Sequence, residues 1–153
     1  VSYTKYYPVG NRGFCPTRKD GWGFDGLGSV PETMAHFNAE TLLIPQCETV
    51  GALESIEEIV ALDGVDGIFV GPYDLSISMG LPGKFDDPVF QAAIDRIISA
   101  CRSAGKFCLF FAGSADAVVA GFERGFDAMA YSLDAALFKK ALKDEVSKIR
   151  EKL

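Results

Sequence analysis

Acidic and amide side chains follow two apolar segments of the sequence, at the points where those segments end. The segment 41–46 ends at Gln46, and Glu48 follows two residues later. The segment 67–71 is followed, through Gly71-Pro72, by Asp74. If both segments are neighbouring parallel strands, about 4.8 Å apart, the two carboxylates meet at one edge of the sheet. Such carboxylates repel unless a cation separates them, and oxygen ligands suit Mg²⁺ or Mn²⁺. Helix N-capping explains the same spacing equally well.

The turn before Asp74 adds a second possible ligand-binding feature. Gly71-Pro72 opens into a short helical turn at Tyr73, whose backbone N–H groups can hold a carboxylate or phosphate. Gln46 leaves the neighbouring strand end and could hydrogen-bond the same ligand. An ordinary turn capped by Ser76 or Ser78 is the alternative interpretation.

Three other features of the sequence favour a structural role over a catalytic one. Residues 21–26 match the spacing G-x-G-x-x-G, but no strand precedes them, which favours a plain loop over a dinucleotide site. The single histidine, His36, lies in a run of mixed polarity typical of an exposed helix. The four cysteines have no Cys-x-x-Cys spacing, and we expect reduced thiols, with Cys101 and Cys108 in the core.

The elements that must position these residues alternate between strand and helix. We expect strands at 41–46, 67–71, 107–111 and 126–131, and helices at 31–39, 50–61, 88–104, 115–123 and 134–150. In the last helix we expect Leu137, Ala141 and Val146 to face inward. Continuous apolar strands between helices indicate a parallel α/β sheet, either open and doubly wound or part of a (β/α)8 barrel.

Composition and length limit the function. The chain has 153 residues, 48% of them hydrophobic, and a net charge of −6. We therefore expect one folded domain over 1–153 with an irregular leading segment 1–30, located in the cytoplasm, and neither nucleic acid nor a membrane as partner. A complete barrel takes about 250 residues, so four βα units would form half of one.

Several motifs together resemble one family, the HpcH/HpaI class II pyruvate aldolases. They are Tyr7-Pro8-Val9-Gly10-Asn11-Arg12-Gly13, Gln46-Cys47-Glu48-Thr49, Gly64-Val65-Asp66-Gly67-Ile68-Phe69-Val70-Gly71-Pro72-Tyr73-Asp74-Leu75-Ser76, Met79-Gly80, Ala112-Gly113-Ser114-Ala115 and Gly125-Phe126-Asp127. The resemblance covers nearly the whole chain in one register. It implies a TIM-type (β/α)8 barrel of which this chain supplies about four βα units, the second half.

The resemblance also implies a chemistry. Glu48 and Asp74 match the ligands of a divalent metal, Mg²⁺ or Mn²⁺, with Co²⁺ as a further option. Gln46, Gly71, Pro72, Tyr73 and Asp74 match the substrate-binding positions. Pyruvate would chelate the metal, which acts as a Lewis acid and stabilises its enolate. The partners would be pyruvate and an aldehyde, or the 2-keto-4-hydroxy acid that joins them.

The strands found here match the fifth to eighth strands of the family. The family's His–acid pair and its substrate-facing Arg are expected in the first half, so neither His36 nor Arg12 is assigned to catalysis. We expect the chain to pair with that missing half, or to form a homo-oligomer with terminal helices exchanged. A lyase of the citrate-lyase β type acting on CoA thioesters, and a non-catalytic half-barrel fragment, are the alternatives.

Overall fold

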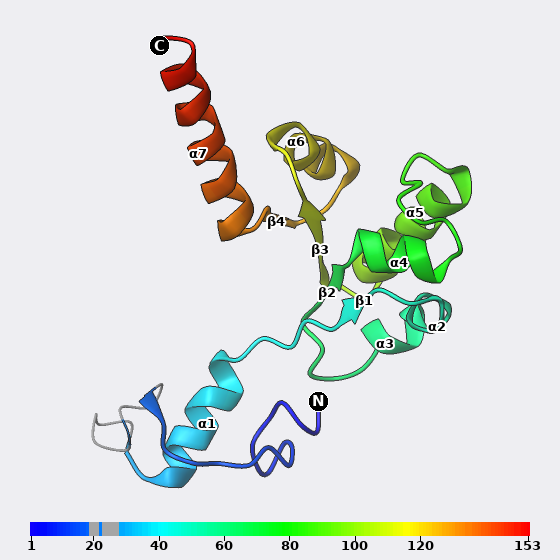
Figure 1. The fold of residues 1–153 in the computed structure, drawn as a ribbon. Coiled ribbons are helices and arrows are strands. Elements are labelled where there is room, and N and C mark those ends of the chain that lie inside the picture. Colours follow the sequence, from blue (N-terminus) through cyan, green and yellow to red (C-terminus); the bar gives the residue numbers. More distant parts are fainter. Residues whose placement is uncertain (19–21, 23–27) are drawn as a thin grey trace.

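The structure, a computed structural model, describes residues 1–18, 22 and 28–153 and contains a parallel sheet of four strands (Figure 1). The sheet order is β1-β2-β3-β4. The strands are β1 (Gln46–Cys47), β2 (Gly67–Val70), β3 (Phe107–Ala112) and β4 (Ala128–Tyr131). The helices are α1 (Val30–Glu40), α2 (Val50–Glu54), α3 (Ile56–Val60), α4 (Pro72–Ser78), α5 (Pro88–Ser103), α6 (Ala115–Arg124) and α7 (Asp134–Arg150). The predicted alternation of strands and helices is confirmed.

The first strand is shorter than predicted. Only Gln46 and Cys47 join the ladder, opposite Phe69 and Val70. Pro45 has no N–H to donate, so the prediction of a strand over 41–46 was wrong for its first five residues. The chain ahead of β1 still follows β2, because Asp66 accepts a hydrogen bond from the Leu43 amide (2.7 Å) and donates its own amide to the Leu43 carbonyl (2.9 Å).

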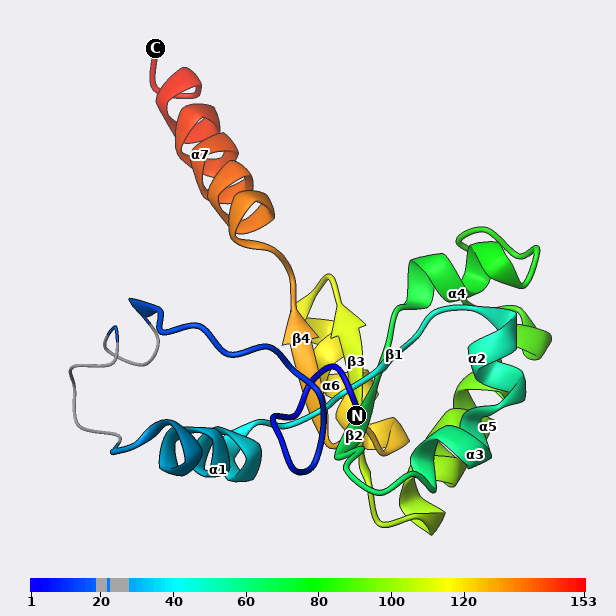
Figure 2. The same ribbon diagram turned by 90° about the horizontal axis from the view of Figure 1, so that it is seen from below.

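The core lies between the sheet and the helices α3 and α5, which cover one of its faces (Figure 2). Asp87 caps α5 by accepting a hydrogen bond from the Val89 amide (2.9 Å). The apolar stripe of α5 is buried, and it consists of Phe90, Ile94, Ile97, Ile98 and Cys101. The predicted single helix 50–61 is instead two short helices that break at Ser55, although its apolar residues Leu53, Ile56 and Val60 are buried.

The helix after β3 begins and ends where the sequence indicates. Ser114 accepts a hydrogen bond from the Ala117 amide (3.2 Å), which caps the start of α6. Gly125 ends the helix with a φ of 108°, a left-handed conformation that glycine adopts without strain. Arg124 reaches Asp95 of α5 at 2.7 Å and so joins the two helices.

The irregular N-terminal segment is anchored on α1. The Asn38 side chain accepts a hydrogen bond from the Tyr6 amide (2.6 Å) and donates one to the Tyr6 carbonyl (2.9 Å). Lys5 donates to the carbonyl groups of Asn38 and Thr41, and Arg12 lies over the Tyr6 ring. His36 is exposed, as predicted. Apart from Trp22, the G-x-G-x-x-G segment lies outside the described residues.

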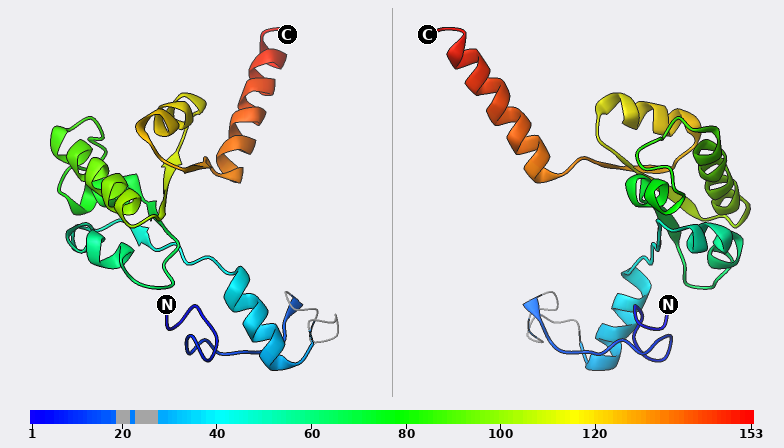
Figure 3. Two further views of the ribbon diagram at one scale, coloured as in Figure 1. Left: turned by 180° about the vertical axis from the view of Figure 1, so that it is seen from behind. Right: turned by 45° about the vertical axis from the view of Figure 1, so that its right-hand side comes forward.

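The last helix stands away from the rest of the chain (Figures 1 and 3). The bounds 134–150 are confirmed, but no residue of α7 is buried. The prediction that Leu137, Ala141 and Val146 face inward was therefore wrong, because the described part of the chain does not cover this face of α7. None of the described helices is long and apolar enough to cross a membrane.

Candidate active site

The carboxyl ends of β1 and β2 bring the predicted site residues together. The Gly71 amide donates to the Cys47 carbonyl (3.3 Å), so the chain that leaves β2 runs beside the chain that leaves β1. Gln46 and Glu48 flank Cys47 on one side of this contact, and the turn leading to Asp74 lies on the other. Parallel pairing thus places an amide and two carboxylates at one edge of the sheet.

The absence of a side chain at position 71 makes room for this arrangement. A Cβ on Gly71 would lie 2.7 Å from Nε2 of Gln46 and 3.3 Å from Oε2 of Glu48. The first separation is shorter than real Cβ contacts, so only glycine leaves both side chains where they are. Gln46 and Glu48 therefore face the same small space in front of the Gly71 backbone.

Most of the predicted residues also line one cavity, of about 170 Å³, at this edge. Gln46, Gly71, Pro72, Tyr73 and Asp74 all contribute to its wall. Glu48 is not part of the wall but lies against Gly71, which is.

Two aromatic residues of this cavity, Phe69 of β2 and Phe111 of β3, are not among those predicted from the sequence. Both are half-buried, on strands whose Val70 and Ala112 neighbours are fully buried. Strand alternation puts successive side chains on opposite faces, and that pattern could have identified the two phenylalanines.

The turn after β2 forms α4 with Pro72 at its first position. The Leu75 amide donates to the Gly71 carbonyl (2.9 Å) as the first helical bond. The N–H groups of Tyr73 and Asp74 therefore stand at the open start of the helix. The Tyr73 ring packs edge-on against Phe85 at 5.0 Å, and the carboxylate of Asp74 is exposed.

Two serines of α4, proposed above as simple caps, instead connect it to other segments. Ser76 is fully buried; its hydroxyl donates to the Tyr73 carbonyl (2.7 Å) and accepts from the Gly83 amide (3.1 Å). Ser78 accepts a hydrogen bond from the Val50 amide (2.9 Å), at the start of α2. These three bonds stabilise the backbone that carries Asp74.

The donor set fits a hard divalent cation. Carboxylate and amide oxygens are the ligands that Mg²⁺ and Mn²⁺ prefer, and the side-chain-free Gly71 leaves space beside the Glu48 carboxylate and the amide end of Gln46. Within the described part of the chain, no three His, Cys, Asp or Glu side chains lie close enough to hold a metal ion.

The buried cysteines are structural rather than reactive. All four cysteines are free thiols, and Cys47, Cys101 and Cys108 are buried. Burial raises the pKa of Cys47 to about 11, and a hydrogen bond with Cys101 together with burial raises the pKa of Cys108. A neutral thiol is a poor nucleophile, so Cys47 does not contribute a reactive group beside Glu48.

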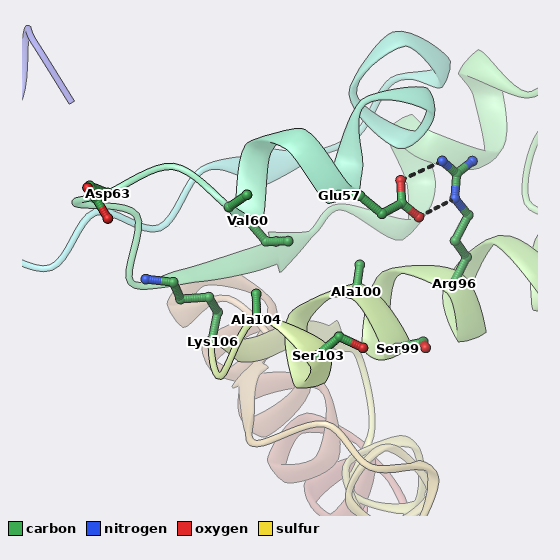
Figure 4. A pocket seen from close by; sticks show the side chains of 10 residues that line it. Glu57, Val60, Asp63, Arg96, Ser99, Ala100, Ser103, Ala104 and Lys106 are labelled. Atoms are coloured by element: carbon green, nitrogen blue, oxygen red, sulfur yellow. Dashed lines mark hydrogen bonds and ion pairs between the residues drawn. The ribbon is translucent and has the colours of Figure 1, made fainter.

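A larger cavity, about 620 Å³, lies on the outer surface between α3 and α5 (Figure 4). At one end Glu57 and Arg96 form an ion pair at 2.7 Å, and at the other lie Asp63 and Lys106. The latter two precede β2 and β3, so the cavity opens toward the amino ends of the strands. Its acidic and basic residues balance, and it takes no part in the site at the carboxyl ends.

Parallel βα units with candidate site residues at the carboxyl ends of the strands are typical of open α/β sheets and of (β/α)8 barrels, and the described sheet has four such strands. The chain belongs to the HpcH/HpaI aldolase/citrate lyase family, whose model matches residues 1–141. The family resemblance and the barrel-type fold predicted from the sequence are both confirmed.

Individual relatives agree with this assignment. The chain is 36% identical over 144 residues to the 2-keto-3-deoxy-L-rhamnonate aldolase of Klebsiella pneumoniae, a match covering 93% of this chain and 52% of the relative. The crystal structure of an HpcH/HpaI aldolase from Desulfitobacterium hafniense superposes with a TM-score of 0.83 at 28% identity. It covers 99% of this chain and 57% of that one.

A second solved structure, an HpcH/HpaI aldolase/citrate lyase family protein from Burkholderia cenocepacia, gives a TM-score of 0.84 at 28% identity. Here the match covers 96% of this chain and 57% of the other. This chain therefore spans about half the length of the proteins it matches, and its described fold is half of their barrel.

Proposed function

We propose that this chain supplies the metal- and pyruvate-binding half of a class II aldolase that cleaves or forms 2-keto-4-hydroxy acids. The observation that carries the proposal is the convergence of Gln46, Glu48 and Asp74 around Gly71 at the carboxyl ends of β1 and β2. The name of the Klebsiella relative supports the substrate class, since 2-keto-3-deoxy-L-rhamnonate is a 2-keto acid with a hydroxyl at C4.

Each residue has a proposed role. Glu48 and Asp74 hold Mg²⁺ or Mn²⁺, and Gln46 hydrogen-bonds the bound keto acid. The N–H groups of Tyr73 and Asp74 donate hydrogen bonds to the pyruvate carboxylate, while Gly71 and Pro72 shape the backbone around it. The bound cation supplies Lewis-acid stabilisation of an enolate. A general base and a substrate-facing arginine come from outside these residues.

We further propose that the sheet is completed by a second set of strands, from another half or from another copy of the chain. β1 and β4 are the two edges of the sheet, and an uncovered edge strand tends to pair with another chain. The exposed apolar side chains of α7 support association as well. The assembly would therefore bury surfaces that this chain leaves open.

Pyruvate binding in the presence and absence of Mn²⁺ tests the proposal. We expect calorimetry to detect pyruvate binding to the Mn²⁺-loaded protein and none to the metal-free protein. Glu48→Gln should abolish the metal-dependent part, whereas Ser114→Ala, which removes a cap on α6, should leave it unchanged. Equal pyruvate affinity with and without Mn²⁺ would overturn the proposed function.

A further inference from the structure

The two proposed metal ligands are carried by separate segments, and two hydrogen bonds join those segments. The first is the bond from the Gly71 amide to the Cys47 carbonyl, 3.3 Å, which belongs to the pairing of β1 with β2. The second is the bond from the Val50 amide to the Ser78 hydroxyl, 2.9 Å. Glu48 lies between Cys47 and Val50, and Asp74 lies between Gly71 and Ser78. The two bonds therefore close a ring that contains both carboxylates.

From this ring we infer that Ser78 is a positioning residue for the metal site, an inference that rests on the proposed function. Asp74 and Ser78 are four residues apart on α4, so their side chains lie on the same face of that helix. The Ser78 hydroxyl thus fixes the rotation of the face that presents Asp74. It does so by holding the backbone two residues after Glu48.

The contacts of Pro72 and Ser76 do not position α4 relative to Glu48. Pro72 fixes where the helix begins, and Ser76 ties its first turn to Gly83, on the loop that follows the helix. Neither of these contacts reaches the segment that carries Glu48. Thr49 caps α2 from within that segment, through the Ala52 amide at 3.2 Å, and does not touch α4. Among the described side chains of α4, Ser78 is the one whose hydrogen bond joins it to the start of α2.

A metal site of two protein ligands depends strongly on their separation. Mg²⁺ and Mn²⁺ require near-octahedral geometry with short bonds, so a rotation of α4 would move the Asp74 oxygens out of range. Loss of residues that orient metal ligands costs about 10–100-fold in affinity. The bond between Ser78 and Val50 is exposed, so water can replace it and the fold itself should tolerate the change.

The test compares Mn²⁺ affinity in four variants of the purified protein, measured by calorimetry and by the electron paramagnetic resonance signal of free Mn²⁺. We expect Ser78→Ala to weaken Mn²⁺ binding about tenfold, at the lower end of such effects. Ser78→Thr keeps the hydroxyl and should restore the affinity. Ser114→Ala is the matched control, because it also removes a serine that accepts from a backbone amide, but on α6. Glu48→Gln reports on the metal site itself.

A second readout does not depend on metal. Amide hydrogen exchange in the metal-free protein should show faster exchange at Val50 in the Ser78→Ala variant, with the thermal unfolding midpoint close to that of the Ser114→Ala variant. Unchanged Mn²⁺ affinity in Ser78→Ala, with affinity lost in Glu48→Gln, would overturn this inference and leave the proposed function standing. Absence of Mn²⁺ binding in the unmodified protein would overturn both.

Discussion

Nε2 of Gln46 lies 2.7 Å from the point where a Cβ on residue 71 would stand, which is closer than a Cβ can approach. The backbone at Gly71 has φ −92° and ψ 91°, values that alanine also adopts. The glycine is therefore required for the space in front of it and not for its conformational freedom. A side chain at position 71 should therefore disturb the site without disturbing the backbone conformation.

Gly71→Ala should impair the site more than the fold. The new methyl group would displace the flexible end of Gln46 and press on the Glu48 carboxylate, 3.3 Å away. We expect Mn²⁺ affinity to fall about tenfold or more, by analogy with the loss of residues that orient ligands. The thermal unfolding midpoint should change little. Gly113→Ala is the control, because Gly113 follows the neighbouring β3 and has open space around it; equal Mn²⁺ affinities in the two variants would contradict the account.

Gly67→Ala should impair the fold more than the site. A Cβ on Gly67 would lie 2.6 Å from the Phe107 carbonyl oxygen and 2.4 Å from the Phe107 ring, because β2 and β3 pair at these residues. Backbone cannot yield as a side-chain end can, so we expect a loss of about 1–3 kcal/mol of unfolding free energy. Urea unfolding measures it. Stability equal to that of the unmodified protein would show that the register of β2 and β3 differs from the one described.

The ion pair between α3 and α5 predicts a dependence on acid. The Arg96 guanidinium hydrogen-bonds Glu57 at 2.7 Å and lowers the pKa of that carboxyl from 4.5 to about 2. Because the folded pKa is below the unfolded one, the contribution of the pair is present above 4.5 and is lost as the pH falls toward 2. The side chains are about half exposed, so the effect on stability is small.

The Glu57 carboxyl can be followed by nuclear magnetic resonance during an acid titration. Arg96→Met should return its pKa toward 4.5. Lys106→Met, which alters another residue of the same outer cavity, should not. A Glu57 pKa near 4.5 in the unmodified protein would show that the ion pair does not form in solution.

The apolar residues of α7 predict an association surface. Phe138 and Leu142 are one turn apart and 70% and 55% exposed, and Val146 and Ile149 continue the row. Phe138→Asp should lower the mass of the assembly measured by light scattering, with the helical circular dichroism unchanged. Lys139→Asp, next along the helix, should leave the mass as it was. If both variants kept the mass of the unmodified protein, α7 would not be the surface of contact.

Local signals in the sequence were sufficient for most elements of the fold. The helices predicted over 88–104 and 115–123 match α5 and α6 to within one residue at each end. Errors arose where a partner outside the local sequence decides the outcome. Helix α7 is amphipathic, but burial of its apolar side depends on contacts that the described residues do not provide. Pro45 shortened β1 because a ladder needs an N–H on the paired residue.

Part of the candidate site could likewise be predicted from local sequence, and part of it could not. Glu48 and Asp74 could be found from their positions after apolar segments, and the chain's family from the residues around them. The contribution of Phe69 and Phe111 depends on which face of each strand looks into the cavity. The bond between Ser78 and Val50 joins residues that are 28 positions apart, so no local pattern predicts it.

The most direct test of the central claim is the dissociation constant of Mn²⁺ measured for the unmodified protein and for Glu48→Gln, Asp74→Asn and Ser114→Ala. Each of the first two variants keeps the size of the side chain but removes an anionic ligand. We expect each to lose at least about 100-fold in affinity, since loss even of supporting groups costs about 10–100-fold. Ser114→Ala should bind as the unmodified protein does. Unchanged Mn²⁺ affinity in both carboxylate variants would contradict the assignment of Glu48 and Asp74 as a metal site.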